Sequence, residues 1–196
     1  MWDERYAEIE FAYGTQPNDF LAENAGLIPT GPVVCLGDGQ GRNGVFLATQ
    51  GHTVLAVDQS AVGLARARAL AASRGVSIQT EVADLADFDL GEGRWMGIVS
   101  IFCHLPSALR KRVHAAAVTA LQPGGVFVLE AYSPEQIAKG TGGPQSPDML
   151  ATLAELQTEL TGLVWQHGVM LERAVHEGRY HNGLSAVVQL IGRKAA

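Results

Sequence analysis

The sequence predicts an α/β fold built on a doubly wound, mostly parallel β-sheet. Between residues 33 and 132, short apolar runs of strand length alternate with longer segments of helical character. Such alternation is typical of parallel strands joined by right-handed crossovers. A second observation is that the first apolar run breaks into closely spaced glycines before its helix. A third is that two strand-like runs follow each other near the end of the chain, which predicts an antiparallel pair that closes the sheet.

The residues before the first strand are expected to form a helical flap, residues 1–25. Residues 3–9 favour one helix, and a turn-forming segment leads into a second helix at residues 19–25. We expect Trp2 and Tyr6 to pack on the domain. Tyr13 is expected at the edge of a ligand site, as part of a lid.

The central part of the chain is predicted to alternate five strands with three helices. The expected strands are residues 33–36, 53–57, 76–82, 97–102 and 126–132. The expected helices are residues 44–50, 61–74 and 106–121. The link at residues 86–94 contains two glycines and is too short for more than a helical turn, and residues 122–125 form a tight turn.

After the fifth strand the pattern changes. We expect a long glycine- and proline-rich loop at residues 133–147 and a helix at residues 147–160, which together form an insertion. The antiparallel pair follows at residues 163–175 and 184–191. Because no linker divides the chain, we predict a single domain, residues 1–196. The glycines of residues 140–144 suit either a lid or a plain connector.

Composition limits the possible partners and compartment. The chain has 196 residues, 47% of them hydrophobic, and a formal net charge of −6, which argues against a nucleic-acid partner. The N-terminus is no signal peptide, and no apolar run approaches the roughly 18 residues of a membrane span. Cys35 and Cys103 lie in apolar surroundings typical of reduced core thiols. We therefore expect a cytoplasmic protein with no membrane partner and no metal, either a monomer or a homodimer.

The glycines after the first strand predict a nucleotide-sized ligand site. A strand, a glycine turn and a helix N-terminus allow close backbone approach and offer free N–H groups to a negative group. The spacing Gly37-x-Gly39-x-Gly41 is typical of an S-adenosylmethionine (SAM) site. The overlapping Gly39-x-Gly41-x-x-Gly44 matches the dinucleotide fingerprint instead. The glycines alone leave both ligands open.

Two acidic residues at strand ends extend the predicted site. Asp58 ends the second strand, where a carboxylate can accept two hydrogen bonds from a ribose, of SAM or of NAD. Asp84 ends the third strand beside the same crevice, and with Leu85 it offers an acceptor and a backbone N–H to adenine. Asp84 therefore favours SAM over NAD. Asp58 could instead serve only the start of the next helix, together with Ser60.

At this point the chain resembles the class I SAM-dependent methyltransferases. The motifs that carry the resemblance are Gly37-Asp38-Gly39-Gln40-Gly41, Val57-Asp58, Ala83-Asp84-Leu85 and Leu121-Gln122-Pro123-Gly124-Gly125. Gly39-Gln40-Gly41-Arg42-Asn43 is most similar to the tellurite-resistance and thiopurine branch of small bacterial enzymes. The resemblance covers residues 13–192. It implies a Rossmann-like, seven-stranded sheet of order 3-2-1-4-5-7-6 with an antiparallel last strand.

The resemblance also implies a cofactor and its contacts. SAM would lie across the strand ends and leave as S-adenosylhomocysteine (SAH) after methylation of a small-molecule acceptor. The residues expected at the cofactor are Tyr13, Gly37, Asp38, Gly39, Gly41, Asn43, Asp58, Gln59, Ser60, Asp84, Leu85 and Ser100. Two positions depart from the family pattern, which usually has an acid where Cys35 stands and often an aspartate where Met96 stands. Asp38 is expected to compensate for Cys35.

Candidates for the acceptor side are fewer. A soft nucleophile such as a thiol or a chalcogen oxyanion needs no base, whereas an oxygen or nitrogen nucleophile can use one. His104, just past the fourth strand, is the best-placed base, and it could equally be a packing residue. Glu172 and Arg173 are the other catalytic candidates. Tyr180 and His181 could line the pocket, but exposed turn positions are more common. Besides a methyltransferase, an NAD(P)-binding oxidoreductase and a SAM-binding protein without catalysis remain as alternatives.

Overall fold

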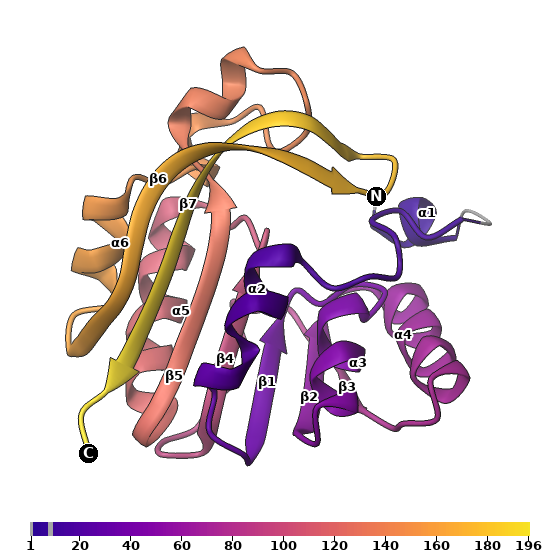
Figure 1. Cartoon of the computed structure of the whole chain (residues 1–196), viewed down its shortest axis with the longest axis horizontal. Helices are drawn as coiled ribbons and strands as arrows, with labels where there is room; N and C mark the ends of the chain where they lie inside the picture. Colours follow the sequence, from indigo (N-terminus) through magenta and orange to yellow (C-terminus); the bar gives the residue numbers. More distant parts are fainter. Residues whose placement is uncertain (1, 8–9) are drawn as a thin grey trace.

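The structure is a computed structural model that describes residues 2–7 and 10–196. These residues form a seven-stranded sheet in the order β3-β2-β1-β4-β5-β7-β6, with helices on both faces (Figure 1). The strands are β1 Pro32–Leu36, β2 Thr53–Asp58, β3 Gln79–Val82, β4 Trp95–Ile101, β5 Leu121–Tyr132, β6 Leu163–Glu177 and β7 His181–Lys194. The pairs among β1 to β5 are parallel, and β7 runs antiparallel to both β5 and β6. The predicted fold class and strand order are confirmed.

Six α-helices connect or cover these strands in the described residues. They are α1 Trp2–Tyr6, α2 Asp19–Asn24, α3 Arg42–Thr49, α4 Ala61–Ser73, α5 Ser107–Ala120 and α6 Leu153–Glu159. Short 3-10 turns lie at Ala25–Leu27, Pro134–Ala138 and Pro147–Met149. Ser60 caps α4 as expected, since its side chain accepts the N–H of Gly63. The predicted end of the first helix, Ile9, lies outside the described residues.

The core divides by strand alternation into two layers. Val34 and Leu36 of β1 face the side covered by α5 and α6, where Leu156 packs. Val33 and Cys35 point to the other face, which α2 and α3 cover. Successive side chains of a strand point to opposite faces, so a strand buried on both sides is apolar throughout. The short apolar runs of the sequence therefore mark the central strands.

Several predicted boundaries need correction. The helix expected at residues 147–160 is broken, because Thr152 adopts an extended conformation and starts α6 with a capping box to Glu155. The expected turn at residues 122–125 belongs to β5, with a register shift opposite β4. The third strand begins only at Gln79, where pairing of this edge strand with β2 begins.

The β6–β7 hairpin is longer than predicted and shapes the site. Figure 1 shows it curving over the carboxyl ends of the parallel strands toward the N-terminal segment. The backbone N–H of Arg179, at its tip, donates to the carbonyl of Ala12 at 3.0 Å. The hairpin tip and the flap thus meet above the edge of the sheet where ligands bind in open α/β folds.

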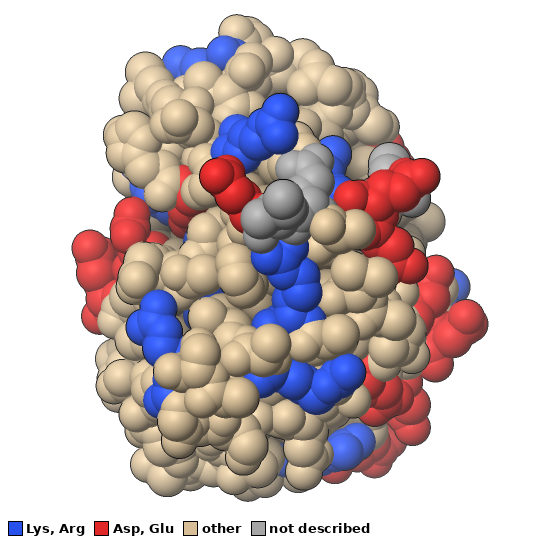
Figure 2. Space-filling model, turned by 90° about the vertical axis from the view of Figure 1, so that its right-hand side faces the viewer, with Lys and Arg blue, Asp and Glu red and all other residues tan. Residues whose placement is uncertain are grey.

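The surface on that side carries charge in separate groups. Figure 2 shows lysines and arginines in short patches across the face, and acidic residues at both of its sides, most of them along the right-hand edge. Within the described part of the chain, no helix combines the length and apolar character that a membrane span requires.

Candidate functional site

A cavity of about 710 Å³ lies at the carboxyl ends of the strands. This volume falls within the roughly 300–1,000 Å³ typical of small-molecule sites. Segments far apart in the sequence line it: the N-terminal flap, the turn after β1, the ends of β2, β3 and β4, the loop after β5 and the hairpin tip. Of the predicted cofactor residues, those that line it are Tyr13, Gly37, Asp38, Gly39, Asn43, Asp58, Gln59, Asp84 and Leu85.

The glycine turn has the backbone that the sequence predicts. Gly37, Gly39 and Gly41 have φ values of +62°, +55° and +85°, a region that other residues rarely adopt. A Cβ on Gly37 would lie 2.9 Å from the Cys103 sulfur, and one on Gly39 would lie 2.6 Å from the Tyr6 hydroxyl. The turn therefore admits only glycine at these positions.

Asp58 ties the glycine turn to the start of α4. One carboxylate oxygen accepts the N–H of Gly39 at 2.9 Å, and the other accepts the N–H of Ser60 at 2.8 Å. Burial raises the pKa of Asp58, and these two hydrogen bonds oppose the rise. A carboxylate offers about four acceptor positions. Two therefore remain for a ligand in the cavity, as a ribose diol would require.

Asp38 lies between the cavity and the start of α3. Both carboxylate oxygens lie 3.3 Å from the N–H of Gly44, which donates to them. Burial raises the pKa of Asp38 to about 7. Cys35 is 1% exposed and packs with the core beneath α2 and α3, so it does not reach the cavity. The carboxylate at the glycine turn therefore comes from Asp38 and not from the position of Cys35.

The β3 end and the flap complete this half of the cavity. Asp84 is exposed there, and its carboxylate accepts the N–H of Ala86 at 2.8 Å. Tyr6 lies over the glycine turn, and Arg5 donates to the Tyr13 hydroxyl at 2.9 Å. Lining by Trp2, Arg5 and Tyr6 was not predicted. Their only signal in the sequence is the spacing of two aromatic residues one helical turn apart.

Three predicted cofactor residues, Gly41, Ser60 and Ser100, do not line the cavity. They lie in the elements around it. Gly41 packs against α4, where a Cβ would lie 2.5 Å from that of Ala67. Ser60 caps α4, and Asp3 of the flap accepts its hydroxyl hydrogen bond. Ser100 is 5% exposed within β4. Met96 packs against Gly31 at the opposite end of β4, away from the site.

His104 lines the cavity on the far side of the glycine turn. Its Nδ1 lies 3.3 Å from the carbonyl of Met149 and must donate there, because a carbonyl only accepts. Burial lowers the pKa of His104 to about 3, so the ring is neutral and Nε2 carries a lone pair. Nε2 is buried and has no hydrogen-bond partner in the described residues.

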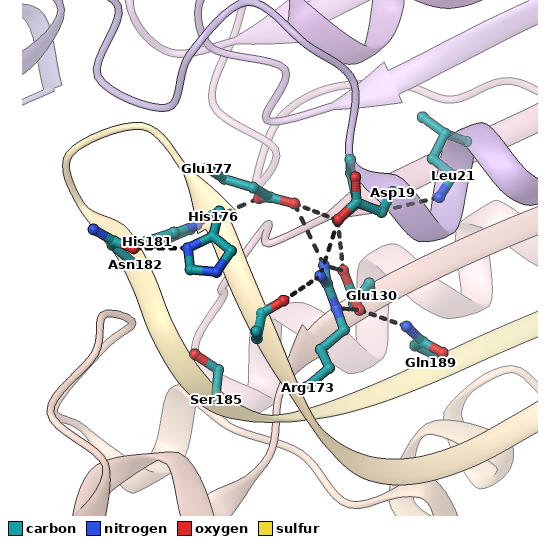
Figure 3. A network of polar contacts seen from close by, with 12 residues as sticks. Asp19, Leu21, Glu130, Arg173, His176, Glu177, His181, Asn182, Ser185 and Gln189 are labelled. Carbon is teal, nitrogen blue, oxygen red and sulfur yellow. Dashed lines mark hydrogen bonds and ion pairs between the residues drawn. The ribbon is translucent and has the colours of Figure 1, made fainter.

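Glu172 and Arg173 lie outside the cavity lining. Glu172 is half exposed and pairs with Lys139 at 2.5 Å. Arg173 joins a buried polar network, in which it donates to Glu130 at 2.8 and 2.7 Å (Figure 3). Asn18 bridges Glu130 and Glu177 in the same network at 2.5 and 2.7 Å. Figure 3 places Arg173 among partners from β5, β6 and the start of α2.

Glu177 links this network to the cavity. Burial would raise its pKa, but hydrogen bonds and the charge of Arg42 lower it to about 2. Arg42, which lines the cavity, pairs with Glu177 at 2.5 Å. Sequence reasoning missed this pair, because the two residues are 135 positions apart and no local pattern marks them.

Comparison with known proteins agrees with this geometry. A family profile described as a methyltransferase domain matches residues 33–125. That stretch holds the glycine turn, Asp58, Asp84 and the Pro123-Gly124-Gly125 segment at the start of β5. This part of the chain is therefore similar to the methyltransferase domain family, in agreement with the motifs of the sequence. The cofactor of this family is SAM. The glycine turn and the two carboxylates at strand ends, Asp58 and Asp84, suit the polar groups of SAM.

Among curated relatives, the chain is similar to a 2-heptyl-1-hydroxyquinolin-4(1H)-one methyltransferase of Mycobacteroides abscessus. The two are 28% identical over 117 residues, which cover 58% of this chain and 52% of the relative. The match thus spans about half the length of that relative.

Two solved structures extend the likeness to the whole fold of this chain. One belongs to work on the conversion of a disulfide bond into a thioacetal group during echinomycin biosynthesis. It gives a TM-score of 0.75 at 22% sequence identity, and the match covers 98% of this chain and 88% of that chain. TehB from Haemophilus influenzae gives a TM-score of 0.74, 18% identity, and coverage of 90% and 62%. Both share the fold.

Proposed function

We propose that the protein transfers the methyl group of SAM to a small-molecule acceptor. The observation that carries this proposal is the division of one cavity into two unlike halves. The glycine turn and the acids Asp58 and Asp84 lie on one side. Neutral and apolar side chains that follow β4 lie on the other. A cofactor half beside an acceptor half is what group transfer between two small molecules requires.

In the cofactor half, each residue has a defined role. Gly37 and Gly39 would let the methionine part of SAM approach the backbone, and Asp38 would pair with its ammonium group. Asp58 would accept hydrogen bonds from the ribose hydroxyls, and Asp84 with Leu85 would bind the adenine edge. The flap residue Tyr6 covers the turn and excludes water, which methyl transfer to a weak nucleophile requires.

The topology favours SAM over NAD(P). A dinucleotide-binding sheet has strand order 3-2-1-4-5-6. Here the antiparallel β7 lies between β5 and β6 instead. Gly44 fits the dinucleotide spacing, but its close approach is to Asp38 and Val54 and is explained by packing of α3. An oxidoreductase function is therefore the weaker alternative.

The acceptor must be nucleophilic with little help from the protein. SAM, when bound, would supply an activated methyl group: the nucleophile would bond to that carbon, the carbon–sulfur electron pair would stay with SAH, and the acceptor's proton would pass to water. A general base works best with a pKa near the working pH. His104, with its pKa lowered to about 3, removes few protons at neutral pH. Its neutral Nε2 would instead accept a hydrogen bond from an O–H, N–H or S–H group of the acceptor and orient it. Thiols and acidic hydroxyls are favoured as acceptors, because they lose their proton without a base.

The test is SAH formation with a panel of acceptors. We expect SAH to accumulate from SAM with at least one of an aromatic thiol, an aliphatic thiol, an acidic phenol or selenite, and not when the acceptor is omitted. Tight SAM binding with no SAH formed from any acceptor class would favour a SAM-binding protein without catalysis. Asp87→Ala, an exposed acid outside the cavity, is the matched control for site variants.

A further inference from the structure

The acceptor half of the cavity is walled by rings. Phe102, His104 and His181 line it, and they come from the end of β4 and the hairpin tip. The Phe102 and His181 rings lie 4.7 Å apart in an edge-to-face arrangement. Such ring edges and faces provide contacts that an aliphatic wall lacks.

A fourth ring fixes the other three from behind. Tyr132 is fully buried and does not line the cavity. Its ring centroid lies 4.6 Å from that of Phe102, 5.2 Å from that of His181 and 5.4 Å from that of His104. The His104 and Tyr132 rings are stacked with only 6° between their planes. The wall is therefore preorganised, which lowers the entropic cost of binding a rigid ligand.

The backbone at this wall is also unusual. Phe102 has a φ of +50°, and it is the one non-glycine residue with positive φ in the described part of the chain. This conformation is strained for a non-glycine residue and persists where the surroundings enforce it. It turns the Phe102 side chain between β4 and His104, where Tyr132 holds it.

The remaining lining of this half is neutral. It includes Ile101, Cys103, Leu105, Pro106, Leu109, Met149 and, from the glycine loop, Gly142, Gly143 and Pro144. Burial raises the pKa of Cys103 to about 12 and lowers that of His181, so both are uncharged at neutral pH. Two arginines line the whole cavity, and one of them, Arg42, is paired with Glu177. Arg5 belongs to the flap, between the Trp2 and Tyr180 rings.

We propose that the acceptor is a planar aromatic or heteroaromatic molecule that carries one hydroxyl, thiol or N–H group, and that inorganic oxyanions are not acceptors. This inference rests on the proposed function and narrows its substrate class. The rings contact the faces and edges of the acceptor, and the Nε2 lone pair of His104 meets its single donor. An oxyanion would lose its hydration in a wall that offers no cation of its own, which is costly.

The test compares a planar aromatic ligand with a saturated, non-planar ligand of the same carbon skeleton and with an inorganic oxyanion. With SAH bound, saturation-transfer NMR would measure the binding of 2-naphthol and of decahydro-2-naphthol, which has the same carbon skeleton without planar rings. Selenite would be tested by its ability to displace 2-naphthol. We expect 2-naphthol to bind most tightly and selenite not to compete. Equal or tighter binding of either other compound would overturn the proposal. Absence of SAH binding in the first step would instead contradict the proposed function.

Two variants locate the binding. Phe102→Leu should weaken 2-naphthol binding about two- to tenfold, the range expected for loss of one aromatic pair, and leave SAH affinity within about twofold. Phe46→Leu removes a ring outside the cavity and should change neither affinity. Should Phe102→Leu unfold, Leu109→Trp, which fills the same half from α5, should block 2-naphthol and retain SAH. Unchanged 2-naphthol binding in either folded variant would refute the site.

Discussion

Asp58 is the residue on which the cofactor half depends most. Its carboxylate joins Gly39 to Ser60 and keeps acceptor positions for a ribose. Asp58→Ala should weaken SAH binding by about 1–3 kcal/mol, the cost of leaving polar partners unpaired, which is about 5- to 150-fold in the dissociation constant. Asp58→Asn keeps one acceptor oxygen and should be milder. Calorimetry checks this, with Asp87→Ala as the control, and unchanged affinity in Asp58→Ala would remove the ribose assignment.

Asp38 links cofactor binding to pH. Because burial raises its pKa to about 7, the carboxyl is largely protonated at pH 6 in the free protein. A ligand ammonium group beside it would favour the carboxylate and lower that pKa. SAH binding should therefore release a proton at pH 6.5 and become tighter as pH rises from 5.5 toward 7, a range in which an α-amino group with a pKa of about 7.7–8.0 stays charged.

Proton release is measured by calorimetry in two buffers with different ionisation enthalpies. The apparent heat of SAH binding at pH 6.5 should differ between the buffers for the wild type and not for Asp38→Asn. Identical heats in both buffers for the wild type would show that Asp38 does not meet the ammonium group.

The same raised pKa of Asp38 means that the folded state binds the proton more strongly than the unfolded chain. Stability from Asp38 is therefore full below about pH 4 and falls as pH rises to about 7.

At the scale of elements, the glycine loop at residues 140–144 is the candidate lid. Gly142 has a φ of +132°, and a Cβ there would lie 2.5 Å from the Tyr180 carbonyl. A Cβ on Gly143 would lie 2.5 Å from the Tyr132 ring. Alanine at both positions should prevent closure. The double variant should lower turnover more than it lowers SAM affinity, because the loop lies over the acceptor half.

Gly140→Ala is the matched control, since Gly140 also has positive φ but has open space around its Cβ position. Hydrogen exchange gives a second measurement: the loop amides should be protected when SAH and an acceptor bind. Normal turnover in the double variant, together with equal exchange with and without ligands, would make the loop a plain connector.

Elements with local signals were predicted well, and elements that depend on distant partners were not. The strand ends at Leu36 and Asp58 follow from apolar runs and glycines, and the cap of α4 follows from Ser60. The hairpin is longer than the sequence predicts, because its polar ends carry no strand pattern. Glu177 extends β6 through partners on the flap and α3, which no local pattern reveals.

At the scale of the whole molecule, the same distinction separates the two halves of the cavity. The cofactor half comes from contiguous motifs between β1 and β3, so the sequence predicted most of its lining. The acceptor half is assembled from the end of β4, the loop after β5 and the hairpin tip. The sequence indicated His104, but it could not show that Tyr180 and His181 turn inward or that Tyr132 holds three rings.

The central claim is that this cavity binds SAM, and calorimetry with three ligands tests it most directly. SAM, SAH and NADH would be titrated into the full chain under one set of conditions. We expect one molecule of SAM or SAH to bind per chain, with NADH giving no saturable heat, because Asp84 and the β7 insertion suit an adenosyl amino acid rather than a dinucleotide. Saturable binding of NADH with no binding of SAM or SAH would contradict the account.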